Sequence, residues 1–178
     1  KNLGSITLPK GLTGIDNIAF YKTKLKSIVI PKGVQVIGSY AFAETSLTSV
    51  QFSEGLITID DKAFSECQIP ILNFPESLQA IGRNAFDSNK VIASVTIPKN
   101  VLNVASAAFD SCEKLSSVTF KGQTPPTISI IFGSELNYVK QAYEPIVKGH
   151  IYVPKGRAEV YKKAEGFKPY INIISEEE

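Results

Sequence analysis

The apolar positions of this chain recur every 22 or 23 residues. One copy opens at Leu25, reads L-x-x-I-x-I-P-x-x-V-x-x-I-x-x-x-A-F, and ends at Phe42. Five such copies follow one another, and a sixth begins before the pattern stops at Pro125 and Pro126. Self-similarity at a fixed period of this length is typical of solenoid proteins, in which each repeat forms one coil. The copies open at Leu3, Leu25, Leu47, Ile69, Ile92 and Leu115.

Each copy carries its own strand and turn signals. The I-x-I segment before the proline predicts a short strand that points alternate side chains inward. Proline then ends the strand, because it has no N–H to donate to a neighbouring strand. Two positions later come residues that we expect to adopt the positive φ of a tight turn, so that the chain folds back in every copy. These residues are Gly11, Gly33, Gly55, Ser77 and Asn100.

The copies are expected to share one core. A copy has seven apolar positions, too few to enclose a hydrophobic interior alone, so its apolar face must be buried against its neighbours. Stacking predicts a parallel sheet on one side of the coils and a column of Ala-Phe turns on the other. The phenylalanines of these turns should form a continuous internal file, made of Phe20, Phe42, Phe64, Phe86 and Phe109.

The only two cysteines, Cys67 and Cys112, each lie three residues after a turn phenylalanine. They are two repeats apart, which corresponds to roughly 10 Å at about 4.8 Å per parallel strand. That separation is beyond the reach of a disulfide. We therefore predict two free thiols within a column of small residues that lines the turns.

The last third of the chain is expected to close the solenoid, because an uncapped last repeat exposes apolar side chains and strand hydrogen bonds. We expect residues 1–120 to form five repeats and a partial sixth, and residues 121–178 to form a capping segment of the same domain. Within it, 156–166 predicts a short helix that ends at its final glycine. The acidic end, 175–178, is expected to be a frayed tail.

The segment between Phe132 and Gly149 has no counterpart in the repeats. Phe132, Leu136, Val139 and Tyr143 are spaced as one face of a helix, for which Ser134 would be the N-cap. One interpretation is a helix that covers the last coil. The other is a contact surface made by Tyr138 and Tyr143, because exposed tyrosines are common in interfaces.

With these residues, the repeat resembles that of the BspA-like, treponemal-type leucine-rich-repeat family, L-x-x-I-x-I-P-x-x-L-x-x-I-x-x-x-A-F-x-x-C. The resemblance covers about residues 3–120 and departs from the consensus at Ser53 and Pro70. It implies an α/β-type, right-handed leucine-rich-repeat solenoid with short parallel strands, few helices and a C-terminal cap. The tail looks like the usual cap of this family, with 151–154 as a strand and 170–174 as its last part. It also implies an exported or cell-surface component of bacteria or some protists, often with a role in adhesion. The family supplies no catalytic residues to transfer.

Charge and candidate chemistry argue against catalysis. The net charge of +2 is too close to balance for a nucleic-acid or membrane footprint, which needs clustered Lys and Arg. The single histidine, His150, has no evident carboxylate or cysteine partner and is expected in a surface loop. No zinc spacing, phosphate loop or nucleophile motif is present. We expect no enzymatic activity, no cofactor and no bound metal.

Two pairs of carboxylates are weak candidates for a cation site. Asp60 and Asp61 are adjacent in an extended segment, where neighbouring side chains point in opposite directions. Glu54 and Glu76 occupy equivalent positions in successive repeats and are close enough to be considered for cation binding. Their column continues into lysines on both sides, so an ion-paired rim is the preferred interpretation.

The chain begins at Lys1 with Leu3 already on the repeat pattern. We therefore expect a fragment of a longer protein whose targeting segment lies outside it. No apolar run approaches the roughly 20 residues that span a bilayer, so we expect no membrane insertion by this segment. A monomer is expected.

The outward positions of the predicted strands are the candidate partner-binding face. They carry mostly short, uncharged, hydrogen-bonding side chains, which suit a peptide or glycan but equally suit an exposed, soluble sheet. The preferred hypothesis is a non-catalytic module of an exported or cell-surface protein that binds a protein or glycan partner. The alternative is a purely architectural spacer. The candidate residues are Ser27, Val29, Ser49, Gln51, Ile71, Asn73, Ser94 and Thr96, together with Tyr138 and Tyr143.

Overall fold

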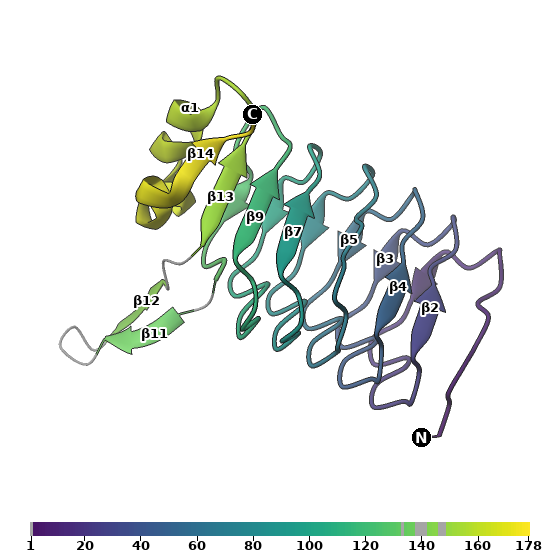
Figure 1. The fold of residues 1–178 in the computed structure, drawn as a ribbon. Helices are drawn as coiled ribbons and strands as arrows, with labels where there is room; N and C mark the ends of the chain where they lie inside the picture. Colours follow the sequence, from purple (N-terminus) through teal and green to yellow (C-terminus); the bar gives the residue numbers. More distant parts are fainter. Residues whose placement is uncertain (1, 133, 138–141, 146–148) are drawn as a thin grey trace.

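In the computed structural model the chain forms a solenoid whose coils stack along one axis. The N-terminal coil lies at one end and the helices of the C-terminal segment lie at the other (Figure 1). The structure describes residues 2–132, 134–137, 142–145 and 149–178. The predicted fold class, a repeat solenoid of short parallel strands with few helices and a C-terminal cap, is confirmed.

A six-stranded parallel sheet runs along the solenoid, and the sequence pattern did not reveal it. Its strands are only two residues long, with the second residue buried, as at Ile37 and Ile59. The last strand follows Pro126, so the sixth coil continues beyond the point where the repeat pattern stops. In sheet order the strands are β1 (Gly14–Ile15), β3 (Val36–Ile37), β5 (Thr58–Ile59), β6 (Ala80–Ile81), β8 (Asn103–Val104) and β10 (Thr127–Ile128).

The predicted I-x-I strands of the second, third, fifth and sixth repeats form on another side of the coils, but they do not make one continuous sheet. Segment 71–74 of the fourth repeat is not a strand. Pro70 lies directly before it, and a proline cannot donate to a strand ladder. One sheet consists of β2 (Ser27–Val29) and β4 (Ser49–Gln51), and the other consists of β7 (Ser94–Ile97), β9 (Ser117–Phe120), β13 (His150–Val153) and β14 (Ile174–Glu176).

The prediction for the turn after each proline is only partly correct. The chain does turn there, since the N–H of Val34 donates to the carbonyl of Pro31 at 3.2 Å. Of the five residues expected to have positive φ, only Gly55 does, with φ of 104°. Positive φ occurs instead two residues before and two residues after each turn phenylalanine. The residues concerned are Ile18, Lys22, Tyr40, Glu44, Lys62, Glu66, Asn84, Ser88, Ala107 and Ser111.

Hydrogen bonds between coils hold the Ala-Phe turns. The N–H of Phe42 donates to the carbonyl of Ala63 in the next coil at 2.8 Å, and the N–H of Tyr40 donates to the carbonyl of Asp61 at 3.0 Å. The same forward direction recurs from the first coil to the fourth. The hydrogen bonds between these turns therefore all run in one direction along the solenoid axis, with N–H groups directed toward the C-terminal end.

The predicted file of phenylalanines is confirmed. Neighbouring rings from Phe20 to Phe109 are stacked, with centroids 5.1–5.5 Å apart and planes within 9° of parallel. Phe42, Phe64 and Phe86 are fully buried. Cys67 and Cys112 are buried and are not joined by a disulfide, as predicted. The core thus runs along the whole stack of coils.

The C-terminal segment packs on the last coil with more structure than the sequence indicated. The predicted helix is α1 (Ala158–Lys163), and the 3-10 helix η1 (Glu165–Ile173) continues after it, so Gly166 does not end the helical region. The hydroxyl of Tyr161 donates to the carbonyl of Gly122 at 2.8 Å, and the hydroxyl of Tyr170 accepts the N–H of Ile131 at 3.1 Å. These two buried tyrosines tie the helices to the sixth coil.

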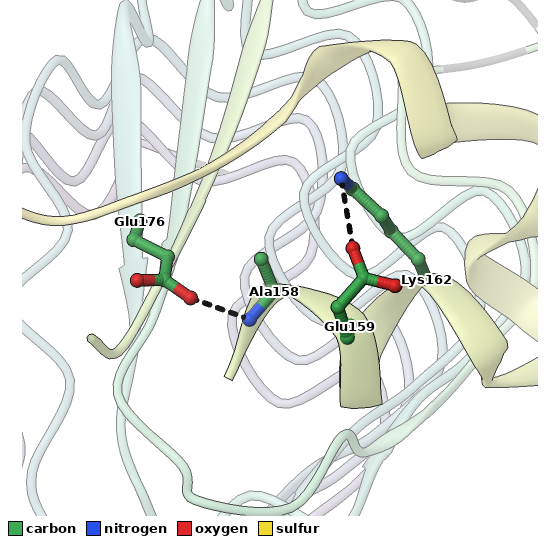
Figure 2. Close-up of polar contacts among 4 residues, drawn as sticks. All are labelled: Ala158, Glu159, Lys162 and Glu176. Carbon is green, nitrogen blue, oxygen red and sulfur yellow. Dashed lines mark hydrogen bonds and ion pairs between the residues drawn. The ribbon is translucent and has the colours of Figure 1, made fainter. Parts of the chain in front are cut away.

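The acidic tail is ordered, contrary to the prediction. Ser175 and Glu176 belong to β14, which pairs in parallel with β13. One carboxylate oxygen of Glu176 accepts the N–H of Ala158, the first residue of α1, at 3.0 Å, as Figure 2 shows. Glu177 forms an ion pair with Lys121 of the sixth coil. The tail therefore extends the sheet by one strand beyond β13, and it supplies a hydrogen-bond acceptor for the first N–H of α1.

The prediction of a helix between Phe132 and Gly149 is wrong. Residues in this segment form an antiparallel hairpin of β11 (Ser134–Asn137) and β12 (Ala142–Pro145), which projects from the solenoid beside β13 (Figure 1). Ser134 is the first residue of β11 rather than an N-cap. Leu136 pairs with Tyr143 across the hairpin. A spacing of seven residues suits one helix face, but it also suits this cross-strand pair, so it does not distinguish the two structures.

Candidate functional site

The outward side of strands β7, β9 and β13 forms a continuous strip of side chains, which we call the ladder face. Parallel pairing aligns three residues in one row and three in the next. Adjacent strands lie roughly 4.8 Å apart, so side chains within a row are immediate neighbours. The first row is Ser94, Ser117 and His150, and the second is Thr96, Thr119 and Tyr152.

Aromatic groups lie at the C-terminal end of the ladder face. The rings of His150 and Tyr152 are 6.0 Å apart between centroids, at an interplanar angle of 31°. His150 is exposed and Tyr152 is half-buried. His150 is the first residue of β13 and not a loop residue as predicted. The ladder face therefore combines hydroxyl groups with two ring systems and carries no Asp, Glu, Lys or Arg.

Two of these residues, His150 and Tyr152, were missed as candidates. A usable signal was present, because H-I-Y-V-P at 150–154 matches S-V-T-I-P at 94–98 position by position. The intervening hairpin shifts this last copy out of the 22-residue period. A search for the motif without a fixed period finds it.

The predicted outward residues are exposed, but the structure separates them into three groups. Ser27, Val29, Ser49 and Gln51 lie on the two-stranded sheet of β2 and β4, and Ser94 and Thr96 lie on the ladder face. Ile71 and Asn73 lie between the two sheets on a segment that is not a strand. The apolar members are prominent, since Val29 is 56% exposed and Ile71 is 66% exposed.

Only one of the two tyrosines of the candidate contact surface lies within the described residues. Tyr138 lies outside the described residues. Tyr143 lies in β12, of which the backbone pairing is described. Their role as a contact surface stays a prediction.

Of the two glutamates considered for cation binding, Glu54 binds the backbone of the next coil through its carboxylate. One oxygen of Glu54 accepts the N–H of Glu76 at 3.0 Å, and the other accepts the N–H of Ser77 at 3.1 Å. This arrangement differs from the ion-paired rim that we expected. It resembles a cap, because two backbone donors of the turn are satisfied by one carboxylate.

The Asp60 and Asp61 pair is also structural. Asp61 accepts the N–H of Arg83 through its carboxylate at 2.7 Å. Partial burial raises the pKa of Asp60, and the negative charge of Asp61 raises it further. Within the described residues, no group of three or more His, Cys, Asp or Glu side chains is placed to hold a metal ion. Likewise, none of the helices in the described part of the chain has the length and apolar character needed to cross a bilayer.

Comparison with known families identifies the repeat. The repeat described as BspA type Leucine rich repeat region matches residues 13–137 in six copies. No curated protein matches the chain.

Three solved structures are similar to this chain, and the first two described here share its fold. A leucine-rich repeat protein from Bacteroides ovatus has a TM-score of 0.63 and 20% identity, over 85% of this chain and 43% of that one. The T. pallidum leucine rich repeat protein has a TM-score of 0.56 and 26% identity, over 64% of this chain and 57% of that one. A leucine rich cell surface protein from Faecalibacterium prausnitzii has a TM-score of 0.47 and 22% identity, over 61% of this chain and 39% of that one. The chain thus spans 39–57% of the length of these proteins.

Proposed function

The chain belongs to the BspA-type leucine-rich-repeat family, and on that premise we propose that it is a non-catalytic binding module of an exported or cell-surface protein. Repeat families of this kind are typically binding modules rather than enzymes. Its partner is a protein or a glycan, and nucleic acid is not a partner. The module acts as a monomer without a cofactor.

The ladder face is the observation that supports this proposal most directly. Hydroxyl groups in register provide hydrogen bonds, and the rings of His150 and Tyr152 provide apolar contact beside them. Aromatic anchors with polar surroundings are typical of binding hot spots. The outward residues of β2 and β4 extend the candidate surface toward the N-terminal end, and Tyr138 and Tyr143 are further candidate contact residues.

Binding is tested by probing the 178-residue protein against a glycan array and a set of immobilised extracellular-matrix proteins. For a ligand that is retained, Thr96→Arg and Tyr152→Ala should each weaken the affinity by about 10-fold or more, the loss expected of a contact worth about 1.4 kcal/mol. The matched control is Thr127→Arg, because Thr127 is an exposed threonine of β10 on the other sheet. It should leave the affinity unchanged.

Two results would contradict parts of this proposal. If neither probe set retains the protein, the architectural spacer becomes the better explanation. If Thr127→Arg weakens binding as much as Thr96→Arg, the ladder face is not the binding surface. Replacing both Tyr138 and Tyr143 with alanine tests the hairpin segment, and intact binding would remove it from the site.

A further inference from the structure

Exposed lysines surround β2 on the outward side of the coils, and we call them the basic surface. We propose that the basic surface binds an elongated polysaccharide that carries sulfate or carboxylate groups. This inference rests on the proposed function and deepens it, because it names the class of glycan and assigns it to another part of the candidate face. The basic surface consists of Lys10, Lys24, Lys26 and Lys32.

The charges are unevenly distributed along the chain, although their sum is only +2. Residues 1–33 contain six lysines and one acidic residue, whereas residues 34–90 contain three basic and seven acidic residues. A cluster of charges of one sign attracts a ligand of the opposite sign even where the protein as a whole is nearly neutral. The local charge of the first two coils therefore decides which ligands they attract.

Two of the four lysines lie directly before β2. Lys24 and Lys26 are exposed, and Leu25 between them is fully buried. Alternate residues of an extended segment point to the same side, so both ammonium groups face the solvent together, with their Cα atoms roughly 7 Å apart. The equivalent positions of the third coil are Ser46 and Thr48. Lysine is therefore not needed at these positions to form a coil.

The other two lysines lie at the opposite end of β2. Lys32 follows the strand, and Lys10 lines the same hollow beside it. The residue equivalent to Lys32 in the next coil is Glu54, which is acidic. Its carboxylate accepts the N–H groups of Glu76 and Ser77 at 3.0 and 3.1 Å. This carboxylate is therefore bound to the fourth coil and does not neutralise Lys32.

The four ammonium groups have no counterion within the part of the chain that the structure describes. None of them belongs to an ion pair there. By contrast, Lys22 of the same coil is paired with Glu44 at 3.0 Å. One exposed ion pair contributes little to binding, but a ligand that neutralises several lysines at once gains from each of them. The basic surface therefore favours a ligand with several negative charges.

The spacing of the lysines favours a long ligand over a small anion. Lys26 and Lys32 are separated by roughly 20 Å of extended chain. Between them, β2 and β4 present the exposed, uncharged side chains of Ser27, Ser49 and Gln51. Their hydroxyl and amide groups can exchange hydrogen bonds with sugar hydroxyl groups. A linear polysaccharide with separated anionic groups matches both the charged ends and the uncharged middle.

Other polyanions match this surface less well. Surfaces that bind nucleic acid typically stack bases on aromatic rings and hold phosphate groups with arginine. Residues 22–39 contain no aromatic residue, and the first arginine of the sequence is Arg83. An acidic protein would need apolar anchors, and Val29 is the only large apolar residue that β2 and β4 expose.

The test measures the affinity of the 178-residue protein for heparin, a linear sulfated polysaccharide, by isothermal titration calorimetry at fixed ionic strength. The variant Lys24→Gln/Lys26→Gln/Lys32→Gln should bind about 10-fold more weakly or worse, because three ion pairs with the ligand are lost together. Its thermal unfolding midpoint should match that of the parent, since these exposed lysines have no partner within the described residues. Dextran, which is uncharged, should not bind to the basic surface.

The matched control removes the same number of charges elsewhere. It replaces exposed lysines of the fifth coil, the sixth coil and α1 with glutamine, namely Lys99, Lys114 and Lys163. This variant should bind heparin nearly as tightly as the parent. A double-stranded DNA oligonucleotide at the same ionic strength should bind more weakly than heparin. The proposal is wrong if heparin is not bound, if both triple variants bind it equally well, or if DNA binds as tightly.

Tyr152→Ala separates this inference from the proposed role of the ladder face. The ladder face is uncharged, so this variant should bind heparin like the parent. If it weakens heparin binding as much as the loss of the three lysines, the basic surface is not the heparin site. If heparin is not bound while another ligand is retained and depends on Tyr152, the basic surface fails and the proposed function stands.

Discussion

At the scale of single residues, the Ala-Phe turns depend on a backbone conformation that their side chains disfavour. Among the described residues, ten that are not glycine have positive φ, and they include β-branched Ile18 and aromatic Tyr40. A left-handed conformation costs roughly 1–2 kcal/mol for a residue with a side chain. The hydrogen bonds between coils offset this cost in every repeat. The sequence did not predict positive φ at these turns, because the glycines lie elsewhere in the repeat.

Replacing a strained residue with glycine should therefore stabilise the protein. Glu66 has φ of 56° and is exposed, so Glu66→Gly should raise the free energy of unfolding by about 1 kcal/mol. The matched control is Gln68→Gly, because Gln68 is equally exposed but does not have positive φ. It should lower the free energy of unfolding by about 0.5–1 kcal/mol. Urea unfolding of both variants measures the difference, and equal effects would contradict the strain.

The buried thiol of Cys67 should make stability fall at high pH. Burial raises its pKa to about 11, while hydrogen bonding with Thr45 acts in the opposite direction. A pKa raised by folding contributes stability that is fully present below the unfolded pKa and is lost as the pH rises through the folded one. The loss should therefore occur between about pH 9 and pH 11, since an unperturbed thiol titrates near 8.5.

Cys67→Thr isolates this effect, because threonine already occupies the equivalent position 45 and keeps a donor without a titrating thiol. Urea unfolding at pH 8, 9 and 10 should show a steeper decline for the parent protein than for the variant. Tyr161, whose pKa burial raises to about 12, titrates in both proteins and does not affect the comparison. Parallel declines would show that the thiol is not responsible.

At the scale of elements, a strand or turn could be predicted only where its pattern of apolar residues is long enough to be recognised in the sequence. The phenylalanine file recurs over many residues and was predicted correctly, as were the I-x-I strands of the second, third, fifth and sixth repeats. The strands of the six-stranded sheet are two residues long, as at Val36–Ile37, which is too short for alternation to be visible. The hairpin was mistaken for a helix because Leu136 and Tyr143 are seven residues apart, a spacing that fits both structures.

The phenylalanine file makes a prediction that depends on position within the stack. Phe64 is fully buried and stacks on a ring at each side, Phe42 and Phe86. Phe64→Ala should therefore lower the free energy of unfolding by about 3–5 kcal/mol. Phe20 is half-buried at the first coil and stacks on Phe42, so Phe20→Ala should cost clearly less. Chemical unfolding followed by circular dichroism measures both, and equal losses would argue against a shared core.

At the scale of the whole molecule, the repeat predicted the stacking of the coils and their shared core, but it did not predict the structure of the C-terminal cap. The cap depends on contacts between distant segments, such as the one from Tyr161 to Gly122, and no periodicity reports them. The same holds for the ladder face. Its Ser94 and Thr96 were predicted from the repeat, whereas His150 and Tyr152 join it only because β13 pairs with β9 after an intervening hairpin.

The two ends of the solenoid should therefore differ in local stability. In a stack of repeats each coil is stabilised by its immediate neighbours, so an end with one neighbour opens more often than the centre. The first coil has one neighbour, whereas the sixth lies under the cap. The backbone amide of Phe20 donates to Ala41 at 2.7 Å, and that of Phe64 donates to Ala85 at 2.8 Å. Because these hydrogen bonds are alike, a difference in their exchange rates reports the opening of coils.

Hydrogen exchange measured by NMR on the 178-residue protein tests this difference. The amide of Phe20 should exchange at least about 10-fold faster than that of Phe64, which corresponds to an opening free energy lower by about 1.4 kcal/mol. The amide of Lys121, which donates to Ile97 at 3.0 Å in the sixth coil, should be protected like that of Phe64, because the cap covers this end. Equal rates at all three amides would mean that the solenoid opens as one cooperative unit.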